Sequence, residues 1–347
     1  MGERLMRMKT LLWATCVLVL GASGAVAEET VTFVSWGGAY QKAQREALLT
    51  PAEALLNVKI LEDTLTGLAE VRAQVKAGAV TWDIVDLEID ECVRAAQEGL
   101  FEPIDYAIVS KDGFEKAAFA EHWIGVIYFS TVLAFSTEAY GDKPPQSWAD
   151  FWDVEGFPGA RAMRKHPSAN IEIALIADGV PLDEIYPIDI DRAFRKLDEI
   201  KPYIDIWWSS GAQSAQLMKD GEVEMSTIWN GRMDAAIADG AMGDYTFNGG
   251  IASLDCLAIP RGSQNPDVAM KVLAALVSAD LQANIPFHIN YGPTNSGAFA
   301  LGKITDEMAA NSPSAPENLK NQVIVRAEWW AENGEAVQER WDAWHIE

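Results

Sequence analysis

This chain is short of basic residues. Its 347 residues include 27 lysines and arginines against 51 aspartates and glutamates, so the formal net charge is −24 at pH 7. A chain of this charge repels a phosphate backbone, which argues against nucleic-acid binding as its function. The same charge attracts cationic solutes, although solubility alone is enough to explain it.

Cysteine and histidine are also scarce, which argues against several kinds of site. The chain has three cysteines and no C-x-x-C motif, and its four histidines are scattered, so we expect neither a metal site nor a cofactor. The G-x-S-x-G motif of serine hydrolases is absent. Cys92 and Cys256 could form a disulfide in an oxidising compartment or serve as small core residues, and the sequence leaves both interpretations open.

The one long apolar run of the chain lies near its N-terminus. Arg4, Arg7 and Lys9 precede the apolar residues 11–20, and small residues then lead to Ala-Val-Ala at residues 25–27. This pattern is typical of a secretory signal peptide cleaved after Ala27, and the run is too short to span a membrane. We therefore expect residues 1–27 to be removed and the mature protein to be exported to the periplasm.

Strand-like and helix-like segments alternate after the signal peptide. We expect strands at residues 31–36, 58–61 and 82–87, with helices at residues 40–56 and 65–77 between them. This alternation predicts βαβ units with a parallel sheet, and so an α/β fold.

One later segment breaks this rhythm. Residues 126–135 form a single β-prone run that is long enough to leave one sheet and enter another. We therefore predict a boundary between two lobes there.

Two apolar strand segments carry a residue that a plain core strand would not have. Trp229 ends the alternating segment 223–229, and the following Asn230-Gly231 predicts a turn. Asp255 is flanked by apolar residues, so its carboxylate needs a cation or hydrogen bonds. Because an ammonium group binds both aromatic faces and carboxylates, we interpret Trp229 and Asp255 as parts of an amine pocket. Core packing of Trp229 and a structural hydrogen bond to Asp255 are the alternatives.

An ordered set of short motifs resembles one known family over nearly the whole mature chain. The similarity is to periplasmic solute-binding proteins of ABC importers, in the spermidine/putrescine-binding group of extracellular solute-binding family 1. The motifs are Ser35-Trp36 with Tyr40, Trp82-Asp83-Ile84-Val85, Ser147-Trp148-Ala149-Asp150-Phe151-Trp152, Gly221-Glu222-Val223, Ile228-Trp229-Asn230-Gly231, Asp255-Cys256-Leu257-Ala258-Ile259-Pro260 and Tyr291-Gly292-Pro293-Thr294.

The resemblance implies a type II periplasmic binding protein fold. In that fold two lobes, each a central, mostly parallel sheet flanked by helices, enclose a ligand cleft. Residues 28–132 plus 255–299 would form the first lobe, and residues 133–254 plus 300–347 the second. The closed form would be a monomer that docks on the membrane subunits of an ABC permease.

The resemblance also assigns roles to five residues. Trp36 and Tyr40 would box the ligand from one side and Trp229 from the other, Asp255 would pair with an ammonium group, and Tyr291 would close the wall. The spacing from Trp36 to Tyr40 is one residue longer here than in polyamine binders.

Other positions depart from the polyamine-binding pattern. Ser253 stands where polyamine binders have a second aromatic residue, and His166 and Ala169 stand where they have acidic residues. The surrounding segment is basic and includes Arg164, which we regard as a candidate ligand for an anion. A diamine therefore lacks an obvious second carboxylate in this segment.

A second anion-binding feature follows along the chain. Ser209-Ser210-Gly211 begins a predicted helix, whose free N–H groups can bind an anion, although Ser210 can equally be an ordinary helix cap. Together with Arg232 it predicts a site for a ligand carboxylate. Glu88, at the end of a strand, is a further candidate for the ammonium group.

These observations predict a binding protein without catalytic activity. Its ligand would be a small amine such as putrescine or spermidine, or alternatively a zwitterionic ω-amino acid such as γ-aminobutyrate. A secreted hydrolase that uses Asp255 and Glu88 as a carboxylate pair is the alternative of a different class.

Overall fold

One mixed sheet runs through the whole of this computed structural model, which describes residues 29–346. The strand order is β2-β1-β3-β8-β4-β7-β5-β6, with β9 added to β4 and β10 to β8. The strands are β1 (Glu29–Ser35), β2 (Val58–Thr64), β3 (Ile84–Glu88), β4 (Ile124–Ser136), β5 (Arg161–Arg164), β6 (Ile206–Trp208), β7 (Met225–Trp229), β8 (Gly243–Ala258), β9 (Gly292–Pro293) and β10 (Val323–Ile324). The predicted signal peptide lies outside the described residues.

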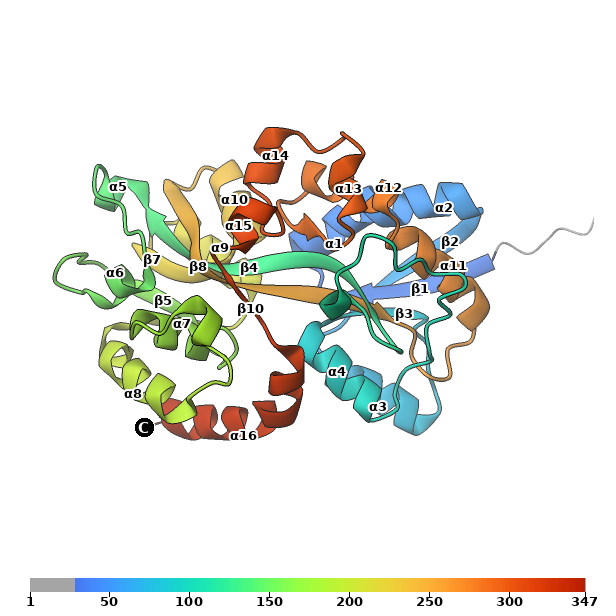
Figure 1. Ribbon diagram of the computed structural model, residues 1–347, viewed down its shortest axis with the longest axis horizontal. Helices are drawn as coiled ribbons and strands as arrows, with labels where there is room; N and C mark the ends of the chain where they lie inside the picture. The colour runs from blue at the N-terminus through green and yellow to red at the C-terminus, as the bar shows by residue number, and fades with distance from the viewer. Residues whose placement is uncertain (1–28, 347) are drawn as a thin grey trace, which may run out of the picture.

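Two long antiparallel strands join the two halves of this sheet (Figure 1). β4 has 13 residues, and nearly all of them are buried. Because the strand is covered on both faces, its sequence is a continuous, mainly apolar run. Its pairing with β8 is irregular between Thr131 and Leu133, which pair with Ile251 and Thr246. The long β-prone run predicted from the sequence is therefore a strand that passes from one half to the other.

The first half contains parallel pairs of β1 with β2 and β3. Side chains alternate between its two faces, so that Phe33 packs in one cluster and its neighbour Val34 in another. The helices of this half are α1 (Gly38–Gln44), which continues through a π-helical segment (Arg45–Leu49) into α2 (Thr50–Leu56), then α3 (Leu68–Ala77), α4 (Ile89–Gln97), α11 (Pro266–Leu276) and α12 (Ala279–Gln282).

The second half repeats this plan, with β5 parallel to β6 and β7. Its helices are α5 (Thr137–Tyr140), α6 (Trp148–Trp152), α7 (Asn170–Ala177), α8 (Ile190–Ile200), α9 (Gly211–Lys219) and α10 (Asn230–Ala238). Short 3-10 turns lie at Lys116–Ala118, Leu182–Glu184, Lys201–Tyr203 and Ile285–Phe287. Ser147 caps α6 in a capping box with Asp150.

The C-terminal segment adds α13 (Gly297–Ala300), α14 (Asp306–Ala310), α15 (Pro316–Leu319) and α16 (Ala327–Ile346). Trp341 and Trp344 of α16 pack against Phe194 of α8. By contrast, Ile304 packs with Ala283 and Ala298 next to α12. The start and the end of this segment therefore cover different parts of the molecule.

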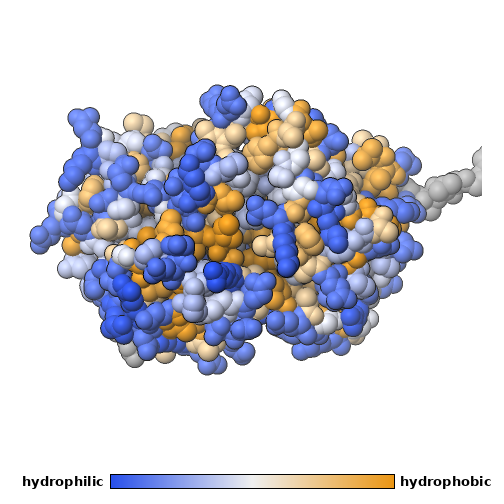
Figure 2. Space-filling model, in the orientation of Figure 1, coloured by the Kyte–Doolittle hydropathy of each residue, from blue (hydrophilic) through white to orange (hydrophobic). Residues whose placement is uncertain are grey.

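Hydrophilic side chains cover most of the visible surface, while apolar side chains gather in the middle of the same face, where β4 and β8 pass between the halves (Figure 2). Within residues 29–346 no single helix is long and apolar enough to cross a membrane. The bent pair of α11 and Ala279–Phe287, with an angle of 55°, reaches that length and composition only when taken together.

The turn predicted at Asn230-Gly231 is wrong, because α10 begins at Asn230. The Asn230 amide makes tertiary hydrogen bonds instead: its Oδ1 accepts from the N–H of Ser130 at 3.0 Å and its Nδ2 donates to the carbonyl of Asn290 at 2.6 Å. A Cβ atom at Gly231 would lie 2.5 Å from Cε1 of Tyr291. This glycine therefore allows a close approach rather than a turn.

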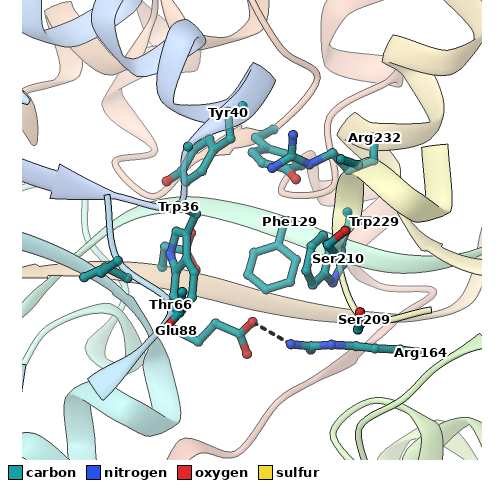
Figure 3. A pocket seen from close by; sticks show the side chains of 17 residues that line it. Trp36, Tyr40, Thr66, Glu88, Phe129, Arg164, Ser209, Ser210, Trp229 and Arg232 are labelled. Carbon is teal, nitrogen blue, oxygen red and sulfur yellow. Dashed lines mark hydrogen bonds and ion pairs between the residues drawn. The ribbon is translucent and has the colours of Figure 1, made fainter. Parts of the chain in front are cut away.

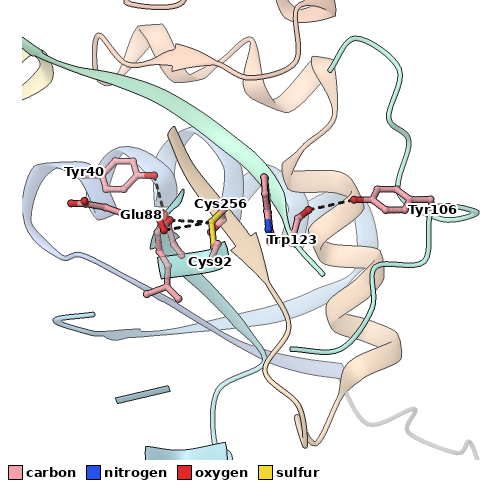
Figure 4. The surroundings of a disulfide bond; sticks show 8 residues. Tyr40, Glu88, Cys92, Tyr106, Trp123 and Cys256 are labelled. Atoms are coloured by element: carbon pink, nitrogen blue, oxygen red, sulfur yellow. Dashed lines mark hydrogen bonds between the residues drawn. A yellow bond between two sulfur atoms is a disulfide. The ribbon is translucent and has the colours of Figure 1, made fainter. Parts of the chain in front are cut away.

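Cys92 of α4 and Cys256 of β8 form a disulfide (Figure 4). Both residues are fully buried, and they are 164 residues apart in the sequence. Of the two interpretations that the sequence leaves open, the structure shows the disulfide. The bond fixes a helix to the long strand that carries Asp255.

Loss of this disulfide should lower the free energy of unfolding by roughly 2–4 kcal/mol, because the cross-link restricts the unfolded chain. Urea unfolding with and without dithiothreitol measures the effect as a lower midpoint under reducing conditions. The double variant C92A/C256A is the control, and its midpoint should not respond to the reductant. A wild-type midpoint that is equal in both conditions would contradict the expectation.

Candidate ligand-binding site

A cavity of about 360 Å³ lies where the ends of strands from both halves of the sheet meet (Figure 3). The residues selected from the sequence for ligand contact all line this cavity: Trp36, Tyr40, Glu88, Arg164, Ser210, Trp229, Arg232, Asp255 and Tyr291. The remaining lining residues are Gly37, Gly38, Leu65, Thr66, Phe129, Ser209, Gly211 and Ala212. The chain therefore brings residues from distant segments to one enclosed space.

Aromatic side chains form much of the cavity wall. Tyr40 meets Tyr291 with ring centroids 5.3 Å apart, and Phe129 lies 6.1 Å from both Tyr291 and Trp229. The contacts of Tyr40 with Tyr291 and of Phe129 with Trp229 are edge-to-face, an arrangement that aromatic pairs favour. The faces and edges of these rings suit the aliphatic part of a ligand and the flank of a cation.

Three carboxylates share one face of the sheet beside this wall. Asp86 and Glu88 are two residues apart on β3, and Glu88 is directly opposite Asp255 on β8. Burial, and then the charges of Asp86 and Glu88, raise the pKa of Asp255 well above its usual value. Oδ1 of Asp255 is buried and has no hydrogen-bond partner. This row of acids therefore has unsatisfied capacity for a cation.

Asp86 is the deepest of the three and is held by hydrogen bonds. Its Oδ2 accepts from the Tyr40 hydroxyl at 2.9 Å, from the Ser35 hydroxyl at 3.2 Å and from the amide of Gln44. Burial raises the pKa of Asp86 to about 7, while these hydrogen bonds act in the opposite direction. Burial and the neighbouring Asp86 also raise the pKa of Tyr40. Tyr40 thus holds the buried acid with its hydroxyl and lines the cavity with its ring.

Arg164 makes an ion pair with Glu88 inside the cavity (Figure 3). Its Nη2 lies 3.2 Å from Oε1 of Glu88, and its guanidinium carbon lies 4.9 Å from the ring centroid of Trp229. The two residues come from β5 and β3, which β8, β4 and β7 separate in the sheet. Arg164 and Glu88, chosen separately from the sequence for opposite ends of a ligand, therefore contact each other.

Arg232 of α10 supplies a second positive charge. Its Nε is buried without a hydrogen-bond partner. A Cβ atom added to Gly211 would lie 2.8 Å from this Nε, and one added to Gly38 would lie 3.2 Å from Nη1 of Arg232. The two glycines therefore let the starts of α9 and α1 approach the guanidinium.

Ser210 is the cap of α9, because its hydroxyl oxygen accepts from the N–H of Gln213 at 3.2 Å. The predicted capping role is thus observed. Ser210, Gly211 and Ala212 also line the cavity, so the N-terminus of this nine-residue helix faces the same space as Arg232. The cavity therefore has a cationic side in addition to its row of acids.

Sequence reasoning missed Asp86, which lies behind the cavity wall, and several lining residues, among them Phe129 and Thr66. Asp86 is a charged residue inside an apolar strand, the same signal that selected Asp255, so it could have been found. Phe129 lies in a run where almost every residue is buried, and nothing in the run marks the residue that faces the cavity. Thr66 follows β2 without a distinguishing pattern.

Within residues 29–346 no group of three or more His, Cys, Asp and Glu side chains is placed to hold a metal ion. Two α/β halves joined by long strands, with charged and aromatic residues of both halves around one cavity, define a two-lobed solute-binding protein. Residues 57–313 match the family of bacterial extracellular solute-binding proteins, so the chain belongs to this family. It is the substrate-binding component of an ABC transporter, which confirms the family and the fold predicted from the sequence.

Curated relatives cover nearly all of the chain. A γ-aminobutyric acid-binding protein of Pseudomonas aeruginosa is 35% identical over 334 residues, which are 94% of each chain. A spermidine/putrescine-binding periplasmic protein of Escherichia coli is 25% identical over 340 residues, again 94% of each chain. These relatives are binding proteins rather than enzymes.

Solved structures agree with this assignment. An ABC transporter substrate-binding protein from Bradyrhizobium japonicum is 43% identical with a TM-score of 0.89, over 91% of this chain and 99% of that one. A periplasmic binding protein from A. tumefaciens B6, solved with glucopine, is 39% identical with a TM-score of 0.85 over the same shares.

The substitution Asp86→Asn should change the stability of the protein more favourably at pH 8 than at pH 4. The folded-state pKa of Asp86 is raised to about 7, so the wild type loses stability as the pH rises from about 4, the usual pKa of an unfolded aspartate, to about 7. Asparagine has no proton to lose. Melting temperatures across this range measure the difference, and Asp112→Asn at an exposed site is the control. A difference between D86N and wild type that does not change with pH would contradict the assignment.

Proposed function

We propose that this protein captures a small zwitterionic amine, an ω-amino acid such as γ-aminobutyrate, and delivers it to an ABC permease without catalysis. One observation carries the proposal. Asp255 and Arg232 are both buried, each has a charged-group atom without a hydrogen-bond partner, and both line the same cavity. A ligand with an ammonium group and a carboxylate satisfies both at once.

The remaining lining residues fit such a ligand. The ammonium group would lie against Asp255 and the aromatic rings of Trp36 and Trp229, with Tyr40 and Tyr291 closing the wall. The carboxylate would lie at Arg232 and the N-terminus of α9, near Ser210. A volume of about 360 Å³ is within the range of small-molecule sites. The 35% identical relative that binds γ-aminobutyric acid supports the same ligand class.

Polyamines are the second candidate, favoured by the row of Asp86, Glu88 and Asp255 and by the spermidine/putrescine-binding relatives. Arg232 would repel the far ammonium group of a diamine, which is why we rank the zwitterion first. A hydrolase that uses Asp255 and Glu88 is not favoured, because Glu88 is in an ion pair with Arg164 and the relatives are binding proteins.

We propose that the signal peptide is cleaved after Ala27 and that the mature protein acts in the periplasm, as its spermidine/putrescine-binding relative does. We propose that the lobes are residues 28–132 plus 255–310 and residues 133–254 plus 311–347, which differs from the division predicted from the sequence only in residues 300–310. The irregular pairing at Thr131 and Leu133 supports the crossing in β4. The packing of Ile304 with Ala283 supports moving residues 300–310 to the first lobe.

The substitution Asp255→Asn should weaken γ-aminobutyrate binding about 100-fold, or about 2.7 kcal/mol, because it removes the carboxylate that pairs with the ammonium group. Isothermal titration calorimetry measures the change, with Asp112→Asn as the control for an exposed carboxylate. Equal affinities of D255N and wild type would refute the ammonium site.

The substitution Arg232→Gln should weaken γ-aminobutyrate binding by a similar factor. It should leave the affinity for butylamine unchanged, because butylamine has no carboxylate. The same calorimetric series with putrescine, spermidine and glucopine ranks the other ligand classes. Tighter binding of putrescine than of γ-aminobutyrate by the wild type would overturn the zwitterion proposal in favour of a polyamine.

A further inference from the structure

The ion pair of Arg164 with Glu88 is the only one between cavity-lining residues in the described part of the chain. Its side chains are 18% and 17% exposed, so solvent screens the pair less than it would a surface pair. The guanidinium also lies over the Trp229 ring at 4.9 Å. Two contacts therefore hold the Arg164 side chain in this place.

Besides Arg164, Glu88 has a neighbour that is also an acid, Asp255. It is directly opposite Asp255 in the antiparallel pairing of β3 and β8, so the two side chains leave the sheet side by side. Two adjacent carboxylates in one cavity are suited to two cationic groups. Arg164 supplies one of these cations from within the protein, which leaves Asp255 as the carboxylate available to a ligand.

The backbone of Arg164 is held independently of its side chain. Its N–H donates to Oγ1 of Thr227 at 3.1 Å, and its carbonyl accepts from Nδ2 of Asn170 at 2.6 Å. A substitution at this position therefore removes the guanidinium and leaves these backbone contacts in place.

We propose that Arg164 determines the charge class of the ligand: by pairing with Glu88 it occupies the second cation position of the cavity and excludes diamines. Arg164 is thus a specificity-determining residue that acts through Glu88, and this role rests on the proposed binding of an amine at Asp255. Removal of the guanidinium should free Glu88 for the far ammonium group of a diamine.

Calorimetric titration of the purified protein with putrescine and γ-aminobutyrate tests the proposal. Arg164→Gln should bind putrescine about tenfold more tightly than the wild type, which corresponds to about 1.4 kcal/mol. The double variant R164Q/E88Q should show no such gain, because the carboxylate that receives the second ammonium group is gone. Arg164→Lys keeps a positive charge beside Glu88 and should still exclude putrescine.

Three results would overturn the role of Arg164: no gain of putrescine affinity in R164Q, the same gain in R164Q/E88Q, or the same gain in R164K. Arg164→Met, which keeps an unbranched chain over Trp229, repeats the test if R164Q does not unfold cooperatively. A wild type that fails to bind γ-aminobutyrate counts against the proposed function alone, since the putrescine comparison between variants does not use that ligand.

Discussion

The antiparallel pairing of β4 with β8 is the constraint on which the rest of the structure depends. These strands carry the sheet from the first half to the second: β8 pairs with β3 through residues 255–258, and β4 pairs with β7 through residues 131–135. Because this one strand pair joins the two halves, the ends of β3, β5 and β7 lie close together beside it, around the cavity. Asp255 and Phe129 lie on the pair itself, so the crossing supplies part of the cavity as well as its frame.

The acidic row shows what this arrangement demands electrostatically. Three carboxylates on one face of a buried sheet oppose folding unless each finds compensation. Asp86 has donors from Ser35, Tyr40 and Gln44, and Glu88 has Arg164. Oδ1 of Asp86 and Oδ1 of Asp255 are both buried without a hydrogen-bond partner, but the donors to Asp86 hold its Oδ2, and of these two residues only Asp255 lines the cavity. A protein tolerates such an unpaired acid where function needs it, and this uneven compensation points to Asp255 as the position for an external cation.

Opposite charges within one cavity also explain the glycines around it. Gly38 and Gly211 allow the starts of two helices to approach Arg232, and Gly231 allows Tyr291 to pack against α10. Side chains at these positions would force the guanidinium or the ring to move. The spacing between the cationic side and Asp255 therefore depends on backbone contacts as much as on the charged residues themselves.

The sequence by itself determined what depends on local order. Alternating apolar segments predicted the strands and helices, the long run at 126–135 predicted the crossing strand, and polar residues within apolar strands marked Asp255 and could have marked Asp86. The prediction of a turn at Asn230-Gly231 was wrong. The Asn230 side-chain amide makes tertiary hydrogen bonds and the absence of a Cβ at Gly231 allows a tertiary contact, and a local pattern does not reveal either.

Only the tertiary structure decided which of the selected residues meet. Glu88 and Arg164 are 76 residues apart, and Cys92 and Cys256 are 164 apart. Their contacts follow from strand order and from the way both halves fold over β4 and β8. Residue type and spacing along the chain carry no information on that geometry, because it is set by long-range strand pairing. The sequence therefore identified a cation site and an anion site, and the structure showed that one of the chosen cations already pairs with one of the chosen acids.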